Sequence, residues 1–124
     1  MLGESFNTIL RDGVIETQVV KNAVVELNDA LENTEKVVEL SEGILRPILV
    51  DMREIKSISK EARDHFSMKA RKPNVSAVAL VVKSPVSKMI GNFFINLSSP
   101  AVPTKLFTRF DSGLEWTKKY RSHG

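Results

Sequence analysis

The segment Pro47-Ile48-Leu49-Val50-Asp51-Met52 decides the fold. Its core, Ile48 to Val50, is continuously apolar, which is typical of a parallel strand that is covered on both faces. Proline is tolerated as the first residue of a strand, where its missing N–H does not interrupt the ladder. The segment therefore predicts a buried central strand.

Strand and helix patterns alternate on both sides of this segment. Asp12-Gly13 predicts a hairpin turn, because both residues tolerate positive φ. Ser84-Pro85 predicts a helix start, with serine as N-cap and proline at the first helical position. The expected strands are Ser5–Leu10, Val14–Val20, a short extended piece at Ala23–Leu27, Pro47–Met52, Ser76–Val82 and Thr104–Phe110, and the expected helices are Asp29–Glu42, Lys60–Lys69, one from Pro85 and one from about Ser112. This order predicts an α/β fold with a mixed, mostly parallel sheet of about five strands and four helices.

Caps and apolar faces are predicted for each helix. Asn28 is the expected N-cap of the first helix and Gly43 its C′ residue. Ser59 is expected to cap the second helix, and Asp111 or a Ser112/Glu115 capping box the last. The residues expected to face inward are Leu27, Ala30, Leu31, Thr34, Val37, Val38 and Ser41 in the first helix, Ala62, Phe66 and His65 in the second, Val86, Met89, Ile90, Phe93, Phe94 and Leu97 in the third, and Trp116 and Tyr120 in the last.

Phe93 and Phe94 are adjacent in the very apolar third helix. Adjacent residues lie about 100° apart around a helix, so both rings are buried only if the helix is covered on two sides. We therefore expect that they are not both fully buried in a monomer, and that the chain self-associates as a twofold dimer.

Length and composition indicate one globular domain over residues 1–124, with residues 121–124 expected to fray. The chain contains no cysteine, which excludes disulfide scaffolds, thiol nucleophiles and cysteine-ligated metals. No targeting pattern opens it, and its longest near-apolar run, Val75–Val82, is far shorter than the ~20 residues of a membrane span. A cytoplasmic protein without membrane insertion is expected.

Charge is distributed unevenly along the chain. Residues 1–62 carry a net charge of −5 and residues 63–124 a net charge of +8. The basic residues are scattered, without an arginine-rich run or interleaved aromatic residues. Opposite solvated helix faces explain this pattern better than a nucleic-acid partner, which we do not expect.

No pattern of residues indicates catalysis. Glycine-rich phosphate loops and metal-ligand spacings are absent from the sequence, so no cofactor and no metal are expected. Ser84, His65 and Asp51 can be drawn as a triad, but no nucleophile-elbow motif surrounds the serine. We therefore expect no catalytic residues and no enzymatic activity.

Polar residues follow the two central strands. Ligands of open α/β sheets bind outside the carboxyl ends of the strands, and helix N-termini there favour anions. Ordinary helix capping explains the same residues. The candidate ligand-binding residues are Asp51, Arg53, Ser57, Ser59, Lys60, Lys83, Ser84, Ser87 and Lys88.

Taken in order, these elements resemble STAS domains, the SpoIIAA-like family of anti-sigma-factor antagonists. Leu49–Met52 is similar to that family's central strand, Ser84–Lys88 to the start of its next helix, and Phe110–Trp116 to its final strand-to-helix junction. The amino-acid sequences of Arg46–Asp51 and Ser57–Arg63 are similar to those of a bacterial branch of the superfamily.

The resemblance implies a non-enzymatic regulatory module that acts by contact with a protein partner, with an anionic or nucleotide-like ligand at the helix N-termini. STAS switches carry a phosphorylated serine at the start of the helix after the central strand. Lys60 and Glu61 occupy the two serine positions here, so phosphorylation is not expected at them. The alternative is a carrier of a small apolar or lipid-like ligand, because STAS folds resemble lipid-transfer domains of the CRAL-TRIO type.

Overall fold

The computed structural model describes residues 5–67, 75–97 and 102–121. A five-stranded sheet has the order β1-β2-β4-β6-β7, with only β1 antiparallel to its neighbour. Its strands are β1 (Phe6–Arg11), β2 (Val14–Val19), β4 (Arg46–Asp51), β6 (Val75–Val81) and β7 (Thr104–Phe107). A second, parallel pair joins β3 (Val24–Val25) to β5 (Ser57–Ile58). The helices are α1 (Leu27–Ser41), α2 (Lys60–Ser67), α3 (Pro85–Leu97) and α4 (Phe110–Lys118).

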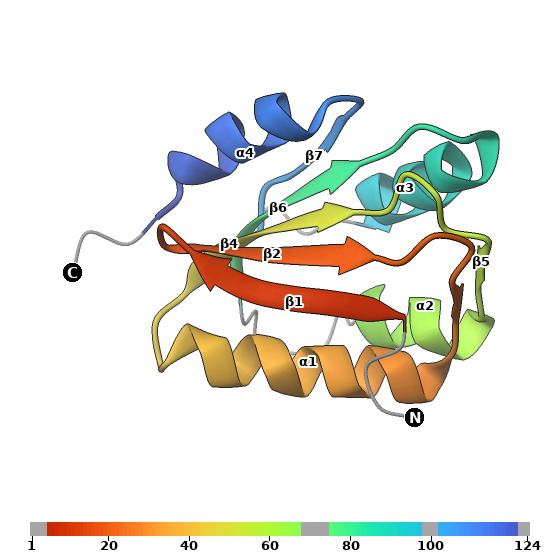
Figure 1. Ribbon diagram of the computed structural model, residues 1–124, viewed down its shortest axis with the longest axis horizontal. Helices are drawn as coiled ribbons and strands as arrows, with labels where there is room; N and C mark the ends of the chain where they lie inside the picture. Colours follow the sequence, from red (N-terminus) through yellow and green to blue (C-terminus); the bar gives the residue numbers. More distant parts are fainter. Residues whose placement is uncertain (1–4, 68–74, 98–101, 122–124) are drawn as a thin grey trace.

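The helices cover the sheet from two sides (Figure 1). Ala30 of α1, Ala62 of α2 and Ile90 of α3 belong to one apolar cluster on one face of the sheet. Leu114 and Trp116 of α4 pack against a second cluster on the opposite face. The predicted α/β fold, with its mostly parallel sheet and four helices, is confirmed.

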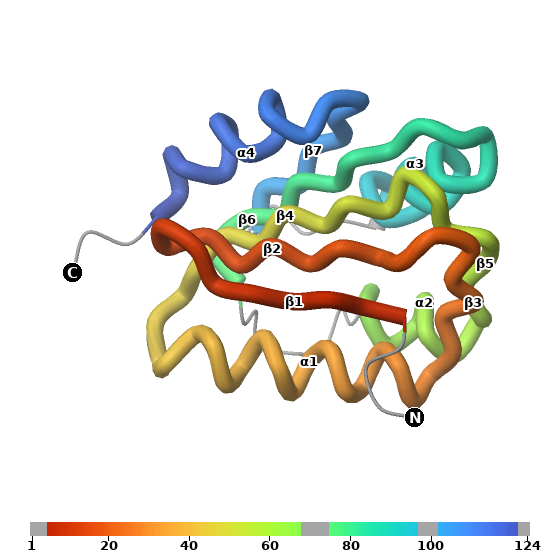
Figure 2. Tube along the Cα trace, in the orientation of Figure 1, coloured from red at the N-terminus to blue at the C-terminus, as the bar shows by residue number. Residues whose placement is uncertain are grey.

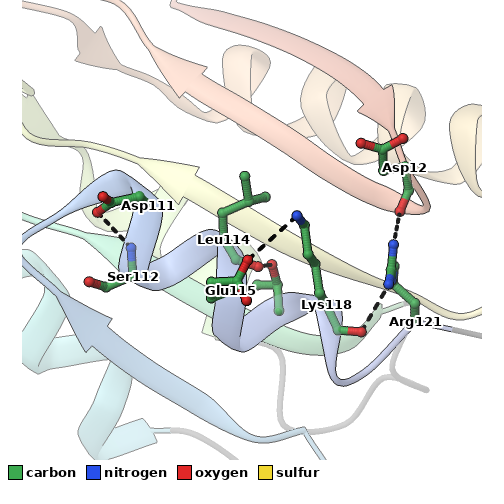
Figure 3. Close-up of polar contacts among 8 residues, drawn as sticks. Asp12, Asp111, Ser112, Leu114, Glu115, Lys118 and Arg121 are labelled. Atoms are coloured by element: carbon green, nitrogen blue, oxygen red, sulfur yellow. Dashed lines mark hydrogen bonds and ion pairs between the residues drawn. The ribbon is translucent and has the colours of Figure 1, made fainter.

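The predicted turn is confirmed between β1 and β2. Asp12 and Gly13 both have positive φ, of 52° and 79°. Arg121, which follows α4, contacts this turn: its Nη1 donates to the carbonyl oxygen of Asp12 at 3.1 Å (Figure 3). Its Nε donates to the carbonyl oxygen of Lys118 at 3.2 Å. Arg121 is therefore part of the folded domain, while residues 122–124 lie outside the described residues.

Two predicted caps are wrong, because the helices begin earlier. The N-cap of α1 is Glu26, which forms a capping box with Asp29, so Asn28 lies inside the first turn. The N-cap of α4 is Arg109, which makes no side-chain cap hydrogen bond. The predicted C-terminal signal of α1 is confirmed, because Gly43 has a φ of 78° after Glu42, which is also left-handed.

The predicted inner face of α1 is partly wrong. Ala30, Val37 and Ser41 are buried, but Leu27, Leu31 and Val38 are exposed. Asn33 is buried instead. The face of α1 that packs on the sheet is therefore narrower than the predicted face, and it includes Asn33.

A polar network explains the buried Asn33. Thr8 Oγ1 on β1 donates to Asn33 Oδ1 at 2.6 Å and lies 3.0 Å from Thr17 Oγ1 on β2. A buried polar group is stable only when it is hydrogen-bonded. The network therefore favours this rotation of α1, although it exposes three apolar side chains on the helix.

The predicted inner face of α3 is also partly wrong. Val86 and Met89 are exposed, whereas Ser87 and Gly91 are buried. Ile90 is buried as expected, and the side chain of Leu97 lies outside the described part of the chain. Phe93 and Phe94 are both half-buried, which confirms that they are not both fully buried.

Gly91 allows α3 to lie close to the sheet. A Cβ atom at this position would lie 2.8 Å from Leu106 Cδ2 and 3.0 Å from Val82 Cγ1. Both distances are shorter than ordinary van der Waals contact, so a larger residue must displace the helix or these side chains. The packing of α3 against β6 and β7 therefore depends on the absence of a side chain here.

Gly91→Val should lower the free energy of unfolding by about 2 kcal/mol, because it overpacks this contact. Asn92→Val is the matched control, since it puts the same side chain on an exposed neighbouring position and should change stability by less than about 0.5 kcal/mol. Urea unfolding measures both values. Equal effects of the two variants would contradict the close approach of α3.

Candidate functional site

The carboxyl ends of β4 and β6 lie side by side. Asp51, the last residue of β4, pairs with Val81, the last residue of β6, and the Met52 N–H donates to the Val81 carbonyl oxygen at 3.0 Å. After β4 the chain continues into β5 and α2, and after β6 it continues into α3 (Figure 2). The nine predicted ligand-binding residues lie on or after these two strand ends.

Asp51 and Arg53 form a tight ion pair. Arg53 Nε donates to Asp51 Oδ1 at 2.9 Å, and Nη2 donates to Oδ2 at 2.7 Å. This hydrogen-bonded contact with Asp51 raises the pKa of Arg53 above its ordinary value. The Asp51 carboxylate is buried, so the arginine neutralises a charge that the fold has removed from water.

Three residues at the start of α3 bond to one another. Ser84 Oγ accepts from the Ser87 N–H at 3.0 Å, as an N-cap does. Ser87 Oγ donates to the Ser84 carbonyl oxygen at 2.9 Å and accepts from the Lys83 N–H at 2.8 Å. Ser87 is fully buried. The predicted cap is confirmed, and both hydroxyl groups are used within the chain.

The start of α2 is organised in the same way. Ser59 Oγ accepts from the Ala62 N–H at 3.1 Å, which confirms Ser59 as the N-cap. Lys60 pairs with Asp64 one turn later, at 2.9 Å between Nζ and Oδ2, and this contact raises the pKa of the lysine. Ser57 lies in β5 and is exposed.

The structure thus divides the nine residues into three local groups: Asp51 with Arg53, the cap of α2, and the cap of α3. Among the described residues, no hydrogen bond or ion pair of the structure joins one group to another. Lys83 and Lys88 are exposed beside the start of α3. Among the described residues neither forms an ion pair, whereas the other two predicted cations, Arg53 and Lys60, are each paired with an aspartate.

One flank of α3 presents apolar side chains to solvent. Met89 is 66% exposed and Val86 36% exposed. Phe93 follows on the same side of the helix, and the guanidinium of Arg63 on α2 lies 4.9 Å from the centre of its ring. We call Arg63, Val86, Met89 and Phe93 the α2–α3 surface.

The sequence predicted incomplete burial of Phe93 and Phe94 on this helix, but it assigned Val86 and Met89 to the inner face, because α3 is rich in apolar residues. Periodicity alone does not show which part of such a helix faces the sheet. Beside Ile90, the small residues Ser87 and Gly91 mark the buried side, and periodicity of large apolar residues does not identify them.

A groove lies on the other flank of α3, between this helix, β7 and the start of α4. Its volume is about 440 Å³. Val82, Leu106 and Phe107 contribute apolar atoms, and its polar lining residues are Lys88, Asn92, Thr108, Arg109 and Ser112. Of the predicted site residues only Lys88 lines it. The residues that line the groove come from two segments that are distant in sequence, one around α3 and one from β7 to the start of α4. No local motif could therefore have indicated the groove.

Within the ranges that the structure describes, no three His, Asp or Glu side chains are arranged to hold a metal ion. His65 Nε2 lies 2.7 Å from Thr34 Oγ1 of α1 and contacts the Phe66 ring. In the same ranges, no helix has the length and apolar character to cross a membrane.

Comparisons with known proteins agree with this architecture. A family model described as a domain of unknown function, DUF7793, matches residues 8–121. No curated protein matches the chain. The structure is similar to a Shewanella loihica PV-4 protein of the DUF3478 family with a SpoIIAA-like fold, at 17% identity and a TM-score of 0.63 over 90% of this chain and 91% of that one. It is also similar to an anti-sigma factor antagonist from Mycobacterium paratuberculosis, at 13% identity and a TM-score of 0.60 over 91% and 92%. The predicted SpoIIAA-like fold is confirmed.

Ser84→Ala should lower the free energy of unfolding by about 1 kcal/mol, because α3 loses its N-cap. Ser57→Ala is the matched control: it removes an exposed hydroxyl from β5 and should change stability by less than about 0.5 kcal/mol. Thermal or urea unfolding measures both. A Ser84→Ala protein as stable as the wild type would show that capping is not the role of this serine.

Proposed function

The chain belongs to the DUF7793 family, and we propose that it is a regulatory module that acts by contact with a partner protein and not by catalysis. The exposed apolar flank of α3 carries this proposal. Met89 and Val86 project into solvent beside α2, where a monomer gains nothing from exposing them. Apolar side chains in this position stabilise a complex when a partner covers them.

Arg63 gives the α2–α3 surface a second reason to be covered. Its guanidinium stacks on Phe93, and Arg and aromatic side chains are enriched at the centres of protein interfaces. The surface thus combines the residue types that contribute most to binding between proteins.

The fold supports a regulatory role by analogy. One solved structure with this fold is described as an anti-sigma factor antagonist. At 13% identity the likeness is one of fold, so the partner of that protein is not assigned to this chain. What transfers to the proposal is the mode of action, which is contact between proteins.

The carrier of a small apolar ligand is the weaker alternative. Such carriers need a pocket that encloses most of the ligand's surface. The α3–β7 groove is open to solvent, and two cations, Lys88 and Arg109, line it. An anionic ligand at the helix starts stays a prediction: capping occupies Ser59, Ser84 and Ser87, so Lys83 and Lys88 are the residues that support it.

Met89→Asp tests the α2–α3 surface, because it puts a charge where a partner would exclude water. The partner is first recovered by affinity purification with this chain and then purified. Met89→Asp should weaken its binding at least about tenfold, as loss of an interface anchor does. Val38→Asp, at an exposed apolar position of α1, is the matched control and should leave affinity unchanged. Isothermal titration calorimetry measures both.

Sedimentation of the same proteins at micromolar concentration identifies the occupant. A wild-type dimer that Met89→Asp dissociates would make the partner a second copy, which is the self-association expected from the sequence. Partner binding that survives Met89→Asp, or that Val38→Asp disrupts equally, would refute this surface.

A further inference from the structure

We propose that the outer edge of β7, which pairs with no other described strand, binds an extended acidic segment of a partner protein together with the α3–β7 groove, so that the segment adds a strand to the sheet. This goes beyond the proposed function, because it uses a different surface and a different kind of contact. The segment would bind by main-chain hydrogen bonds, and the groove would select its side chains.

The edge of β7 offers main-chain groups for such pairing. β7 is the last strand of the sheet, and its inner side pairs with β6. The carbonyl oxygens of Pro103 and Phe107 accept from the N–H groups of Val78 and Val82 at 2.9 and 2.8 Å. Backbone groups of successive strand residues point to opposite edges, so those of Thr104 and Leu106 point away from β6.

The groove gives this edge two walls. Lys88 and Asn92 of α3 lie on one side, and Arg109 and Ser112 at the start of α4 lie on the other. Leu106 and Phe107 of β7 form the floor together with Val82. The groove therefore lies at the carboxyl end of β7, where a segment paired beside Leu106 would reach it.

The charge of the groove favours an acidic segment. Lys88 and Lys105 are exposed, and Arg109 is paired with Asp111 by two hydrogen bonds of 3.1 and 2.9 Å. Lys88, Lys105 and Arg109 thus place three positive charges near β7, against the one negative charge of Asp111.

The groove and the α2–α3 surface are separate sites on α3. Lys88 and Met89 are adjacent residues, so their side chains diverge by about 100° around the helix. Lys88 lines the groove beside β7, whereas Met89 lies on the flank that carries Phe93 and Arg63. A substitution on one flank therefore tests one site without removing the other.

An alternating Glu-Val hexapeptide, titrated into the ¹⁵N-labelled full chain and followed by NMR, tests the proposal. Amide shifts are expected for Lys88, Asn92 and residues 104–112, and none for β1, the other edge of the sheet. The same peptide N-methylated at alternate residues lacks the donors for strand pairing, and a Lys-Val hexapeptide reverses the charge. Neither should bind.

Lys88→Ala should weaken binding of the Glu-Val peptide about two- to fivefold, as expected for one exposed ionic contact, and less at high salt. Lys36→Ala removes an exposed lysine from α1 and is the matched control, with unchanged affinity. Met89→Asp should also bind the peptide normally, which separates this test from that of the proposed function. Equal binding of the N-methylated or Lys-Val peptide, or shifts confined to the starts of α2 and α3, would overturn the proposal.

Discussion

The parallel pairing of β4 with β6 is the constraint on which the rest of the structure depends. Leu49 of β4 and Ala79 and Val81 of β6 are fully buried beneath α4, while Ile48 of β4 and Leu80 of β6 are buried on the opposite face. Parallel strands need a crossover connection, so α2 crosses between these two strands. The same pairing fixes both carboxyl ends at one edge, and from there α2 and α3 begin close to the sheet.

Helix α3 contributes residues to both of the proposed binding surfaces, the α2–α3 surface and the α3–β7 groove. Ser87 and Gly91 on its buried side are small, and Gly91 in particular allows the helix to approach Val82 and Leu106 closely. Ile90 is buried with these two small residues, whereas other large residues of the helix lie on its flanks. Met89 and Phe93 consequently lie toward α2, and Lys88 and Asn92 toward β7. The exposure of Met89 and the α3–β7 groove have the same structural cause.

The sequence predicted most of the fold because the strongest signals were local. Continuous apolar runs marked β4 and β6, Asp12-Gly13 marked the hairpin, and Ser59 and Ser84 marked two helix starts. The faces of α1 and α3 were predicted less well. Apolar periodicity assigned Leu31 to the core, but the partner that buries Asn33 is Thr8, which is 25 residues away in the sequence. Long-range polar pairing of this kind leaves no pattern in a single sequence.

Most polar groups of the predicted ligand-binding site are used in local hydrogen bonds, and binding of an anion there stays a prediction. Ser84, Ser87 and Asp51 were chosen for their chemistry, and each of them bonds within four residues along the chain. A polar group that is satisfied locally stabilises a helix start or a loop, and a ligand must compete with that bond. The groups that the fold leaves open are of another kind: apolar side chains on one flank of α3 and the main-chain edge of β7. We therefore propose other polypeptides as the binding partners, since a polypeptide chain offers both a complementary apolar surface and a row of amides.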